Sequence, residues 1–427
     1  VPAHQRKTRG RKALPEHLPR VEVIHDLDEA DKVYDTDGHA LHKIGEDISE
    51  QLEIIPAKIR VIRNIRIKYG CRACETGIKT ASMPAQLIPK SMATPGLLSY
   101  IATSKYVDAL PLYRQEQMFK RIGVELSRAT LAFWMIQVGK ALAPLIVLLE
   151  EALLSGKVIH MDETPVQVLN EPDRKAQSQS YMWVRMGGMT DHPIVLFNYD
   201  PSRSSKVPLR LLEGFTGHLM TDGYAGYHAV TKHGITGIGC WAHARRKFKE
   251  AEKVQGKSKG SGKVHLALSE IQKLYVIERQ IADKLPDEKL AIRQARAGPV
   301  LHKMRRWLDK SRTQVSPKSA LGKALGYLDG EWPRLARYVD DGRLPIDNNP
   351  CENAIRPFVI GRKNWLFSQS QAGVEASAVT YSLIETAKRS GHEPLHYLTH
   401  VLTELPTTKP DDLQDLLPHN IPAITFH

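Results

Sequence analysis

Hydrophobic and polar residues follow three successive patterns in the first part of the chain. Residues 1–20 are basic and contain prolines, which predicts a flexible segment. Residues 21–75 alternate apolar and polar side chains, most clearly in AKIRVIRNIRIKYG, and predict a small β-rich module. Residues 76–156 repeat apolar side chains at helical spacing and predict a helical region, which we interpret as a DNA-binding or linking region. Within it, the stretch from Ala109 to Val138 has the outline of a helix-turn-helix motif, although plain helical packing gives the same pattern.

Strand-like alternation returns in residues 157–248. The stretches KVIHMDETPVQVL, YMWVRMGGM and HPIVLFNYD predict three adjacent strands, and after a short helix HLMTD and GITGIGC predict two more. This order predicts an α/β fold with a mixed five-stranded sheet and helices against it. Residues 249–344 are predicted to be helical and separate the fifth strand from residues 345–402, so we interpret them as an insertion. Within residues 345–402, the stretch 372–402 predicts closing helices. Residues 403–427 form a proline-rich tail.

Composition narrows the class of protein. The chain has 427 residues, 42% of them hydrophobic and 25% charged, which predicts two to four domains with sizeable cores. A net charge of +13 favours a polyanionic partner, although a basic protein without such a partner has the same charge. Four cysteines indicate a reducing compartment such as the cytoplasm. We expect no apolar stretch of transmembrane length and no signal peptide, and the first residue, Val1, is typical of a truncated or processed chain.

Three acids stand at positions that the predicted elements can bring together. Asp162 is expected at the end of the first strand and Asp222 at the end of the fourth. Glu352 is expected on a helix, because the preceding Asn-Asn-Pro is a helix start signal. Clustered carboxylates repel one another unless a cation lies between them, and hard oxygen ligands suit Mg²⁺ or Mn²⁺. Two such ions can promote phosphodiester displacement. By position alone, Glu163 is an alternative to Asp162.

Two cations share the predicted helix with Glu352. Arg356 and Lys363 follow it by four and eleven residues. At about 100° per residue, the three side chains lie within roughly 40° of one another around the helix. Pro357 is expected to kink this helix. An ordinary surface ion pair has the same spacing, so the pattern alone does not define a binding site.

The β-rich module contains an incomplete set of zinc ligands. Cys71 and Cys74 form a Cys-x₂-Cys pair, which is half of the set in a zinc ribbon. The sequence has no second pair of this kind, and the upstream turn carries Tyr34 and Asp37 with histidines nearby. A zinc site completed by His or Asp and a module without metal are both compatible with this pattern.

The motifs around the three acids resemble those of bacterial DDE transposases. The resemblance is carried by the DET and TDGY segments of Asp162 and Asp222, by CWAHARRKF, and by the spacing of Glu352, Arg356 and Lys363. NNPCENAIRPFVIGRKNWLF closely resembles the third-acid motif of the insertion-sequence-sixty-six family, whose transposase is of the TnpC type. The similarity extends from LPEHLPR to LTELPTTKPDDLQDLLPHN. It implies an RNase H-like core, metal-dependent DNA strand cleavage and transfer, and binding to terminal inverted repeats.

The resemblance also implies roles for individual residues. Arg356 and Lys363 would contact phosphates near the cleaved bond. Cys240 and His243 resemble a Cys-x₂-His pair found after the second acid of many such enzymes, which is either structural or metal-binding. The metal ligands would be Asp162, Asp222 and Glu352. A basic group at the head of the following helix either faces DNA or is simply solvated, and comprises Arg245, Arg246 and Lys247.

The same resemblance predicts the state of the β-rich module and the binding partners of the protein. Tyr34 and Asp37 stand where the family has its first Cys pair, so the module is expected to be a degenerate zinc-ribbon-like one. The expected partners are DNA ends and target DNA, further copies of the chain on DNA and small accessory proteins, with no membrane. Two alternatives to a transposase are a catalytically silent DNA-binding relic and an RNase H-like nuclease without strand transfer.

Overall fold

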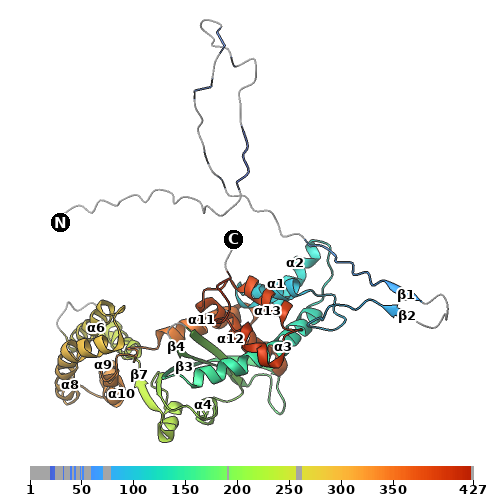
Figure 1. Ribbon diagram of the computed structural model, residues 1–427. Coiled ribbons are helices and arrows are strands. Elements are labelled where there is room, and N and C mark those ends of the chain that lie inside the picture. The colour runs from blue at the N-terminus through green and yellow to red at the C-terminus, as the bar shows by residue number, and fades with distance from the viewer. Residues whose placement is uncertain are drawn as a thin grey trace. The chain divides into compact units, whose positions relative to one another are not determined.

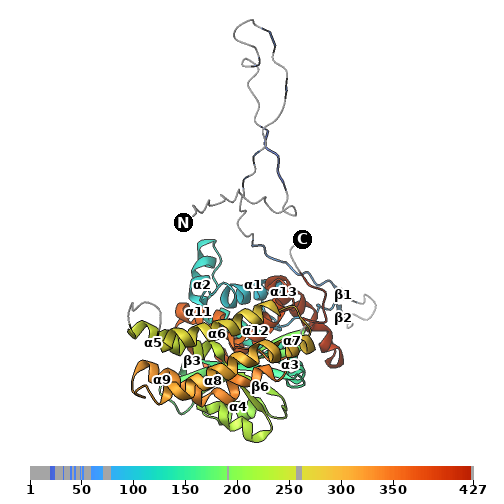
Figure 2. The same cartoon turned by 90° about the vertical axis from the view of Figure 1, so that its left-hand side faces the viewer.

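The computed structural model describes residues 59–70, 78–189, 192–255 and 262–424 and, before them, residues 20–24, 32, 39, 40, 43, 44, 49 and 51 (Figures 1 and 2). The chain divides into two compact units, residues 1–83 and residues 84–426. In the first unit, strand β1 (Lys68–Gly70) pairs antiparallel with β2 (Ile78–Thr80). Most of the predicted β-rich module, including Tyr34, Asp37, Cys71 and Cys74, lies outside the described residues.

A mixed sheet forms the centre of the second unit. Its strands follow the order β5-β4-β3-β6-β7, and a further strand, β8, pairs with β3. Strands β3, β4 and β5 are antiparallel neighbours, whereas β6 and β7 run parallel to β3. The predicted mixed α/β class is therefore confirmed. The strands are β3 (Val158–Asn170), β4 (Gln179–Met189), β5 (His192–Asp200), β6 (His218–Thr221), β7 (Thr236–Gly239) and β8 (Ser368–Ser370).

The predicted number of strands was too small by one. Strand β8 pairs in parallel with Val168 and Asn170 of β3. Its sequence, SQS, is polar and lacks β-branched residues, so no local pattern marks it as a strand. It pairs with the end of β3 beyond the residues that pair with β4 and β6, where the backbone groups of β3 are open to another strand.

Helix α3 (Arg128–Leu154) provides a large part of the core. It begins after Ser127, whose hydroxyl accepts a hydrogen bond from the backbone N–H of Thr130. It packs against α12 (Gln371–Arg389) and against β4 and β5. Among the described helices it is the one long and apolar enough to span a membrane by length and composition, so the expectation of no such stretch is wrong. Burial of one side of α3, including Leu131, accounts for much of its apolar character.

Helix α12 also protects an edge of the sheet. Strand β5 lies at that edge, where backbone N–H groups would otherwise lack partners. The hydroxyl of Ser382 accepts a hydrogen bond from the N–H of Phe197 at 2.7 Å, and that of Thr386 accepts one from Val195 at 3.1 Å. Two polar residues of a buried helix face thereby act in place of a neighbouring strand.

Helices α5 to α10 form a second core beyond β7 (Figures 1 and 2). This core includes Met220 and Ile238 from the sheet. Trp241 is fully buried and its Nε1 donates a hydrogen bond to the carbonyl of Leu335 at 2.8 Å. The helices of this core are α5 (Trp241–Gln255), α6 (Lys263–Gln280), α7 (Pro286–Ile292), α8 (Gly298–Arg312), α9 (Ala320–Gly330) and α10 (Trp332–Ala336).

The remaining α-helices belong to the core around the sheet. Gly123, with φ of +80°, lies in the turn that follows Arg121, the last residue of α2. These helices are α1 (Pro95–Tyr106), α2 (Leu112–Arg121), α4 (Lys206–Leu211), α11 (Asn349–Trp365) and α13 (Pro394–Glu404).

Gly139 offers a test of the packing of α3 on α12. A Cβ atom there would lie 2.6 Å from Cβ and 2.7 Å from Cα of Ala376, so the helices would have to shift. We expect Gly139→Ala to lower the free energy of unfolding by about 1–3 kcal/mol. The matched control is Gly326→Ala in α9, where a Cβ atom meets nothing within 4 Å and a gain of up to about 1 kcal/mol is expected. Urea unfolding measures both effects, and equal effects would contradict the packing argument.

Candidate active site

Asp162 and Asp222 lie on neighbouring parallel strands. The register pairs His160 of β3 with Met220 of β6, and continuing it by two residues brings Asp162 beside Asp222. Asp222 directly follows β6, and its Oδ1 accepts a hydrogen bond from the backbone N–H of Tyr224 at 2.9 Å. The expectation that Asp162 ends its strand is wrong, because β3 continues to Asn170, well beyond the residues that pair with β6.

Asn348 fixes the start of the helix that carries Glu352. Its Oδ1 lies 2.9 Å from Nδ1 of His160, its Nδ2 donates to the carbonyl of Met161 at 3.0 Å, and its backbone N–H donates to Sγ of Cys240 at 3.2 Å. Asn348 is the N-cap residue of α11, but its side chain makes no capping bond to that helix. The Asn-Asn-Pro signal thus predicted the helix start correctly and gave no hint of these long-range contacts.

The three candidate acids interact electrostatically. Burial, followed by the negative charges of Glu163, Asp222 and Glu352, raises the pKa of Asp162 to about 7. Asp222 and Glu352 therefore lie near enough to Asp162 for their charges to affect its pKa. A hard divalent cation such as Mg²⁺ or Mn²⁺ suits this donor set, because it prefers oxygen ligands and offsets their repulsion.

Glu163 lies next to these acids in a different environment. Its side chain is 3% exposed, and its Oε1 lies 2.5 Å from Nη2 of Arg203. The hydroxyl of Tyr227 donates a hydrogen bond to its Oε2. Asp162, by contrast, has no ion pair with a Lys or Arg among the described residues. The geometry therefore favours Asp162 over Glu163 as a free metal ligand.

The cations of α11 divide into exposed and anchored ones. Arg356 and Lys363 are exposed and make no ion pair with any residue in the described parts of the chain. Arg362 lies between them and donates hydrogen bonds to Oγ1 of Thr164 at 2.9 Å and to the carbonyl of Pro165. Arg362 thus fastens α11 to β3, a role that no local feature of the sequence indicates.

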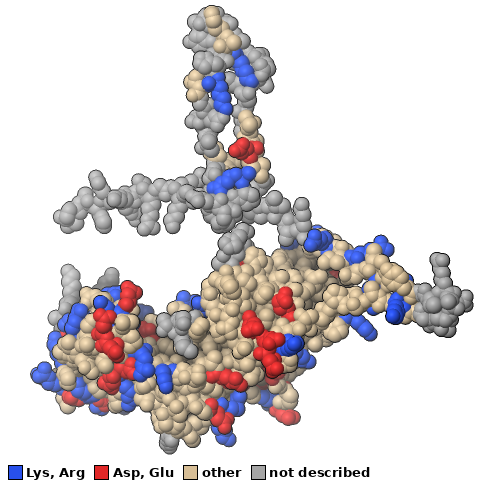
Figure 3. All heavy atoms as spheres, viewed as in Figure 1, with Lys and Arg blue, Asp and Glu red and all other residues tan. Residues whose placement is uncertain are grey.

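The basic group at the head of α5 is partly paired. Arg245 is exposed, Arg246 lies 3.3 Å from Oε2 of Glu352, and Lys247 lies 3.6 Å from Oε2 of Glu250. On the face drawn in Figure 3, acidic and basic side chains are intermixed over α6 and α8. The positive net charge is therefore not gathered into one patch on that face.

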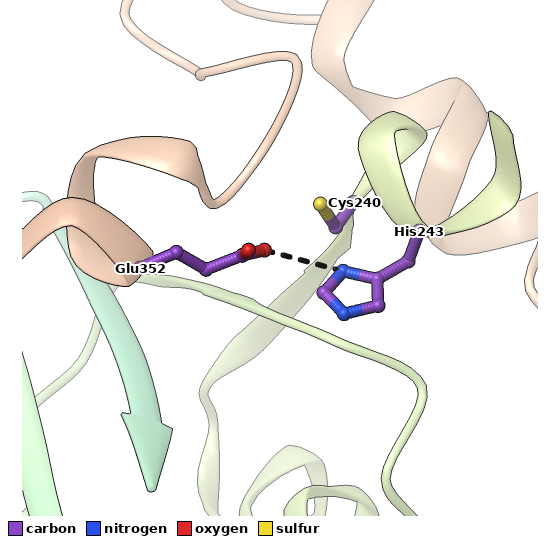
Figure 4. A group of neighbouring side chains, drawn as sticks. All are labelled: Cys240, His243 and Glu352. Atoms are coloured by element: carbon purple, nitrogen blue, oxygen red, sulfur yellow. Dashed lines mark ion pairs between the residues drawn. The ribbon is translucent and has the colours of Figure 1, made fainter. Parts of the chain in front are cut away.

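Cys240 and His243 lie beside Glu352 rather than forming an isolated pair (Figure 4). Sγ of Cys240, a ring nitrogen of His243 and a carboxylate oxygen of Glu352 all lie within 4.8 Å of one another. Nδ1 of His243 is 3.5 Å from Oε1 of Glu352. Burial raises the pKa of the Cys240 thiol to about 12, and burial lowers the pKa of His243.

Clustered carboxylates on a mixed sheet, close to exposed cations, define a candidate metal-dependent site for a polyanionic substrate. Sequence comparisons agree with this class of site. The family described as "Transposase IS66 family" matches residues 90–376. The zinc-finger domain of IS66 transposases matches residues 36–75, and the IS66 C-terminal element matches residues 382–419. The chain belongs to the IS66 transposase family, which confirms the resemblance seen in the motifs.

Similar proteins of Sinorhizobium fredii (strain NBRC 101917 / NGR234) match almost the whole chain. Uncharacterized protein y4jD is 36% identical over 423 residues, which cover 95% of this chain and 81% of that protein. Uncharacterized protein y4qI is 35% identical over 430 residues, which cover 97% of this chain and 78% of that protein. Membership of the family supports a DNA-cleaving enzyme with DNA as its partner and with use of divalent metal.

The raised pKa of Asp162 predicts a pH-dependent loss of stability in metal-free buffer. The Asp162 carboxyl group keeps its proton up to about pH 7 in the folded state, whereas in the unfolded chain it loses the proton near pH 4. Stability contributed by the protonated form is thus full below about pH 4 and is lost as the pH rises to about 7. We expect Asp162→Asn to exceed the wild type in free energy of unfolding by about 1–3 kcal/mol at pH 8, and by much less at pH 4.

Urea unfolding with a chelator present, repeated at several pH values, measures this difference. Asp283→Asn removes an exposed carboxylate of the segment after α6 and controls for the loss of one negative charge. A difference between Asp162→Asn and the wild type that does not change with pH would contradict the assigned environment.

Proposed function

We propose that the chain is a DDE transposase that cleaves DNA at the ends of an insertion sequence and joins the freed strand to target DNA. The observation that carries the proposal is the register of β3 and β6, which brings Asp162 beside Asp222, together with the bonds by which Asn348 holds the start of the helix of Glu352 against β3. Membership of the IS66 family supports DNA cleavage in general. The three acids supply the more specific assignment.

The strand order supports an RNase H-like core. Three antiparallel strands are followed by two parallel ones in the order β5-β4-β3-β6-β7, with Asp162 on β3 and Asp222 directly after β6. We assign the catalytic core to residues 157–248 and 345–402, with residues 249–344 as a helical insertion. The flanking parts are residues 1–20 as a basic segment, 21–75 as a zinc-ribbon-like module, 76–156 as a DNA-binding or linking region and 403–427 as a tail.

Asp162, Asp222 and Glu352 would hold Mg²⁺ or Mn²⁺, with two ions as the expected number. Such ions, when bound, activate a water or a 3′-hydroxyl and stabilise the leaving oxygen. The protein's own part is to keep the three carboxylates together, which Asn348 does from the α11 side. Arg356 and Lys363 would then bind phosphates near the cleaved bond, because they are exposed and unpaired among the described residues.

The head of α5 would supply further phosphate contacts through Arg245, Arg246 and Lys247. Lys247 can leave Glu250 at little cost, because an exposed ion pair contributes about 1 kcal/mol or less. The DNA partners would be terminal inverted repeats and target DNA, bound by several copies of the chain with small accessory proteins. Such a protein acts on the nucleoid in the bacterial cytoplasm, and the zinc-finger match supports both DNA and zinc as partners of the first unit.

The assignment of the acids is tested by removing one carboxylate at a time. We expect Asp162→Asn, Asp222→Asn and Glu352→Gln each to lower strand cleavage of a labelled DNA end by at least about 100-fold. DNA affinity should change little, because the exposed cations remain. Calorimetry with Mn²⁺ and a DNA end should show weaker metal binding for Glu352→Gln than for the wild type.

Glu163→Gln is the matched control because it removes the neighbouring buried acid that is paired with Arg203. It should reduce stability while the folded fraction keeps its cleavage activity. A single-acid variant that keeps wild-type activity would show that its assignment is wrong. Nicked DNA without joined strands would indicate the nuclease alternative, and DNA binding by the wild type without any cleavage would indicate the relic.

A further inference from the structure

We propose that Cys240, His243 and Glu352 form a binding site for Zn²⁺ or a similar thiophilic divalent cation, and that this site shares Glu352 with the three-acid site. Cys240 lies between β7 and α5, His243 lies in the first turn of α5, and Glu352 lies in the first turn of α11 (Figure 4). A thiol, an imidazole and a carboxylate are the donors that zinc binds in proteins, whereas Mg²⁺ does not favour sulfur.

The distances suit a tetrahedral ion with one position left for water. The three donor atoms lie within 4.8 Å of one another, and Nδ1 of His243 is 3.5 Å from Oε1 of Glu352. Ligand atoms around tetrahedral zinc, with bonds of about 2.0–2.3 Å, are separated by roughly 3.3–3.8 Å. Small side-chain rotations would therefore complete the site. Glu352 and His243 are 25% and 20% exposed, which leaves a path for the ion.

Two of the donor atoms lack hydrogen-bond partners. Nδ1 of His243 and Oε1 of Glu352 are buried polar atoms without a hydrogen bond to any described residue. Buried polar atoms in this condition cost free energy, and a shared metal ion would satisfy both. Sγ of Cys240 already accepts a hydrogen bond from the backbone N–H of Asn348 at 3.2 Å. Such outer contacts orient metal ligands, and binding would release the thiol proton of Cys240 to solvent.

Arg246 opposes this site. Its Nη1 lies 3.3 Å from Nε2 of His243 and its Nη2 lies 3.3 Å from Oε2 of Glu352. When Nδ1 binds a metal, Nε2 carries the proton and can no longer accept a hydrogen bond from Arg246. The Arg246 side chain is 52% exposed and can turn toward solvent. Removing Arg246 should therefore strengthen zinc binding.

The consequence for activity rests on the proposed function. An ion held by Cys240 and His243 engages Glu352, which the three-acid site also needs. Strand cleavage supported by Mg²⁺ should then fall as the concentration of free Zn²⁺ rises. The shared acid would make the enzyme sensitive to zinc at its own catalytic centre.

Binding is tested with Co²⁺, which replaces zinc and absorbs in the near ultraviolet when a thiolate is a ligand. Titration of the full chain in excess Mg²⁺ should give this absorption, and Cys240→Ser should lose the part due to the site. His243→Ala should weaken it by at least about tenfold, since even outer-shell losses cost that much. Arg246→Ala should strengthen it. Circular dichroism checks that Cys240→Ser folds, and His243→Ala tests the site independently of the buried thiol.

Two controls separate this site from the other thiols. The double variant Cys71→Ser, Cys74→Ser removes the pair in the zinc-finger region, and Cys351→Ala removes the other buried cysteine of the second unit. Both should keep the absorption that depends on Cys240. Absorption that vanishes in either control and persists in Cys240→Ser would overturn the proposal, as would no absorption beyond that of Cys71 and Cys74.

Inhibition is measured as the ratio of strand cleavage with and without Zn²⁺ at constant Mg²⁺. This ratio should fall for the wild type and change at least about tenfold less for Cys240→Ser. A Cys240-dependent Co²⁺ signal without cleavage under any condition would count against the proposed function and leave the metal site standing. Cleavage that is insensitive to zinc, together with no Cys240-dependent signal, would overturn the metal site alone.

Discussion

The buried side chain of Asn348 holds together the segments on which the candidate active site depends. It is 1% exposed and bonds to His160 and to the carbonyl of Met161, while its backbone N–H reaches Cys240. A buried amide of this kind must make its hydrogen bonds or incur a penalty of about 1–3 kcal/mol. The start of α11 is therefore confined to one position relative to β3, and Glu352 is fixed with it.

The long separation along the chain explains why such a constraint is needed. Asn348 and His160 are 188 residues apart, and the helices α5 to α10 lie between the strand β7 and the helix α11. These helices share a core with Met220 of β6 and Ile238 of β7, so they pack against the sheet and stabilise these two strands. Arg362 adds a second attachment of α11 to β3 at Thr164. Together these contacts keep an acid from a distant segment beside two acids of the sheet.

Sequence reasoning succeeded where local pattern and geometry coincide. Alternation identified the main strands, and parallel pairing of β3 with β6 brought Asp162 and Asp222 together by register alone. It failed where a contact depends on distant residues. The polar strand β8 exists because β3 offers a free edge, and the bonds of Asn348 leave no periodic trace in the sequence. The choice between Asp162 and Glu163 likewise depended on Arg203, 40 residues away.

Glu352 lies between two environments of opposite charge. On one side are the acids Asp162 and Asp222, and on the other are Arg246 and His243. The pair with Arg246 is half-exposed, and such pairs contribute about 1 kcal/mol or less. A divalent cation that binds several carboxylates at once gains far more, because its attraction to each carboxylate outweighs the repulsion among them. Under the proposed function, Arg246 would neutralise Glu352 when no metal is bound and would become free to contact a phosphate when a metal displaces it.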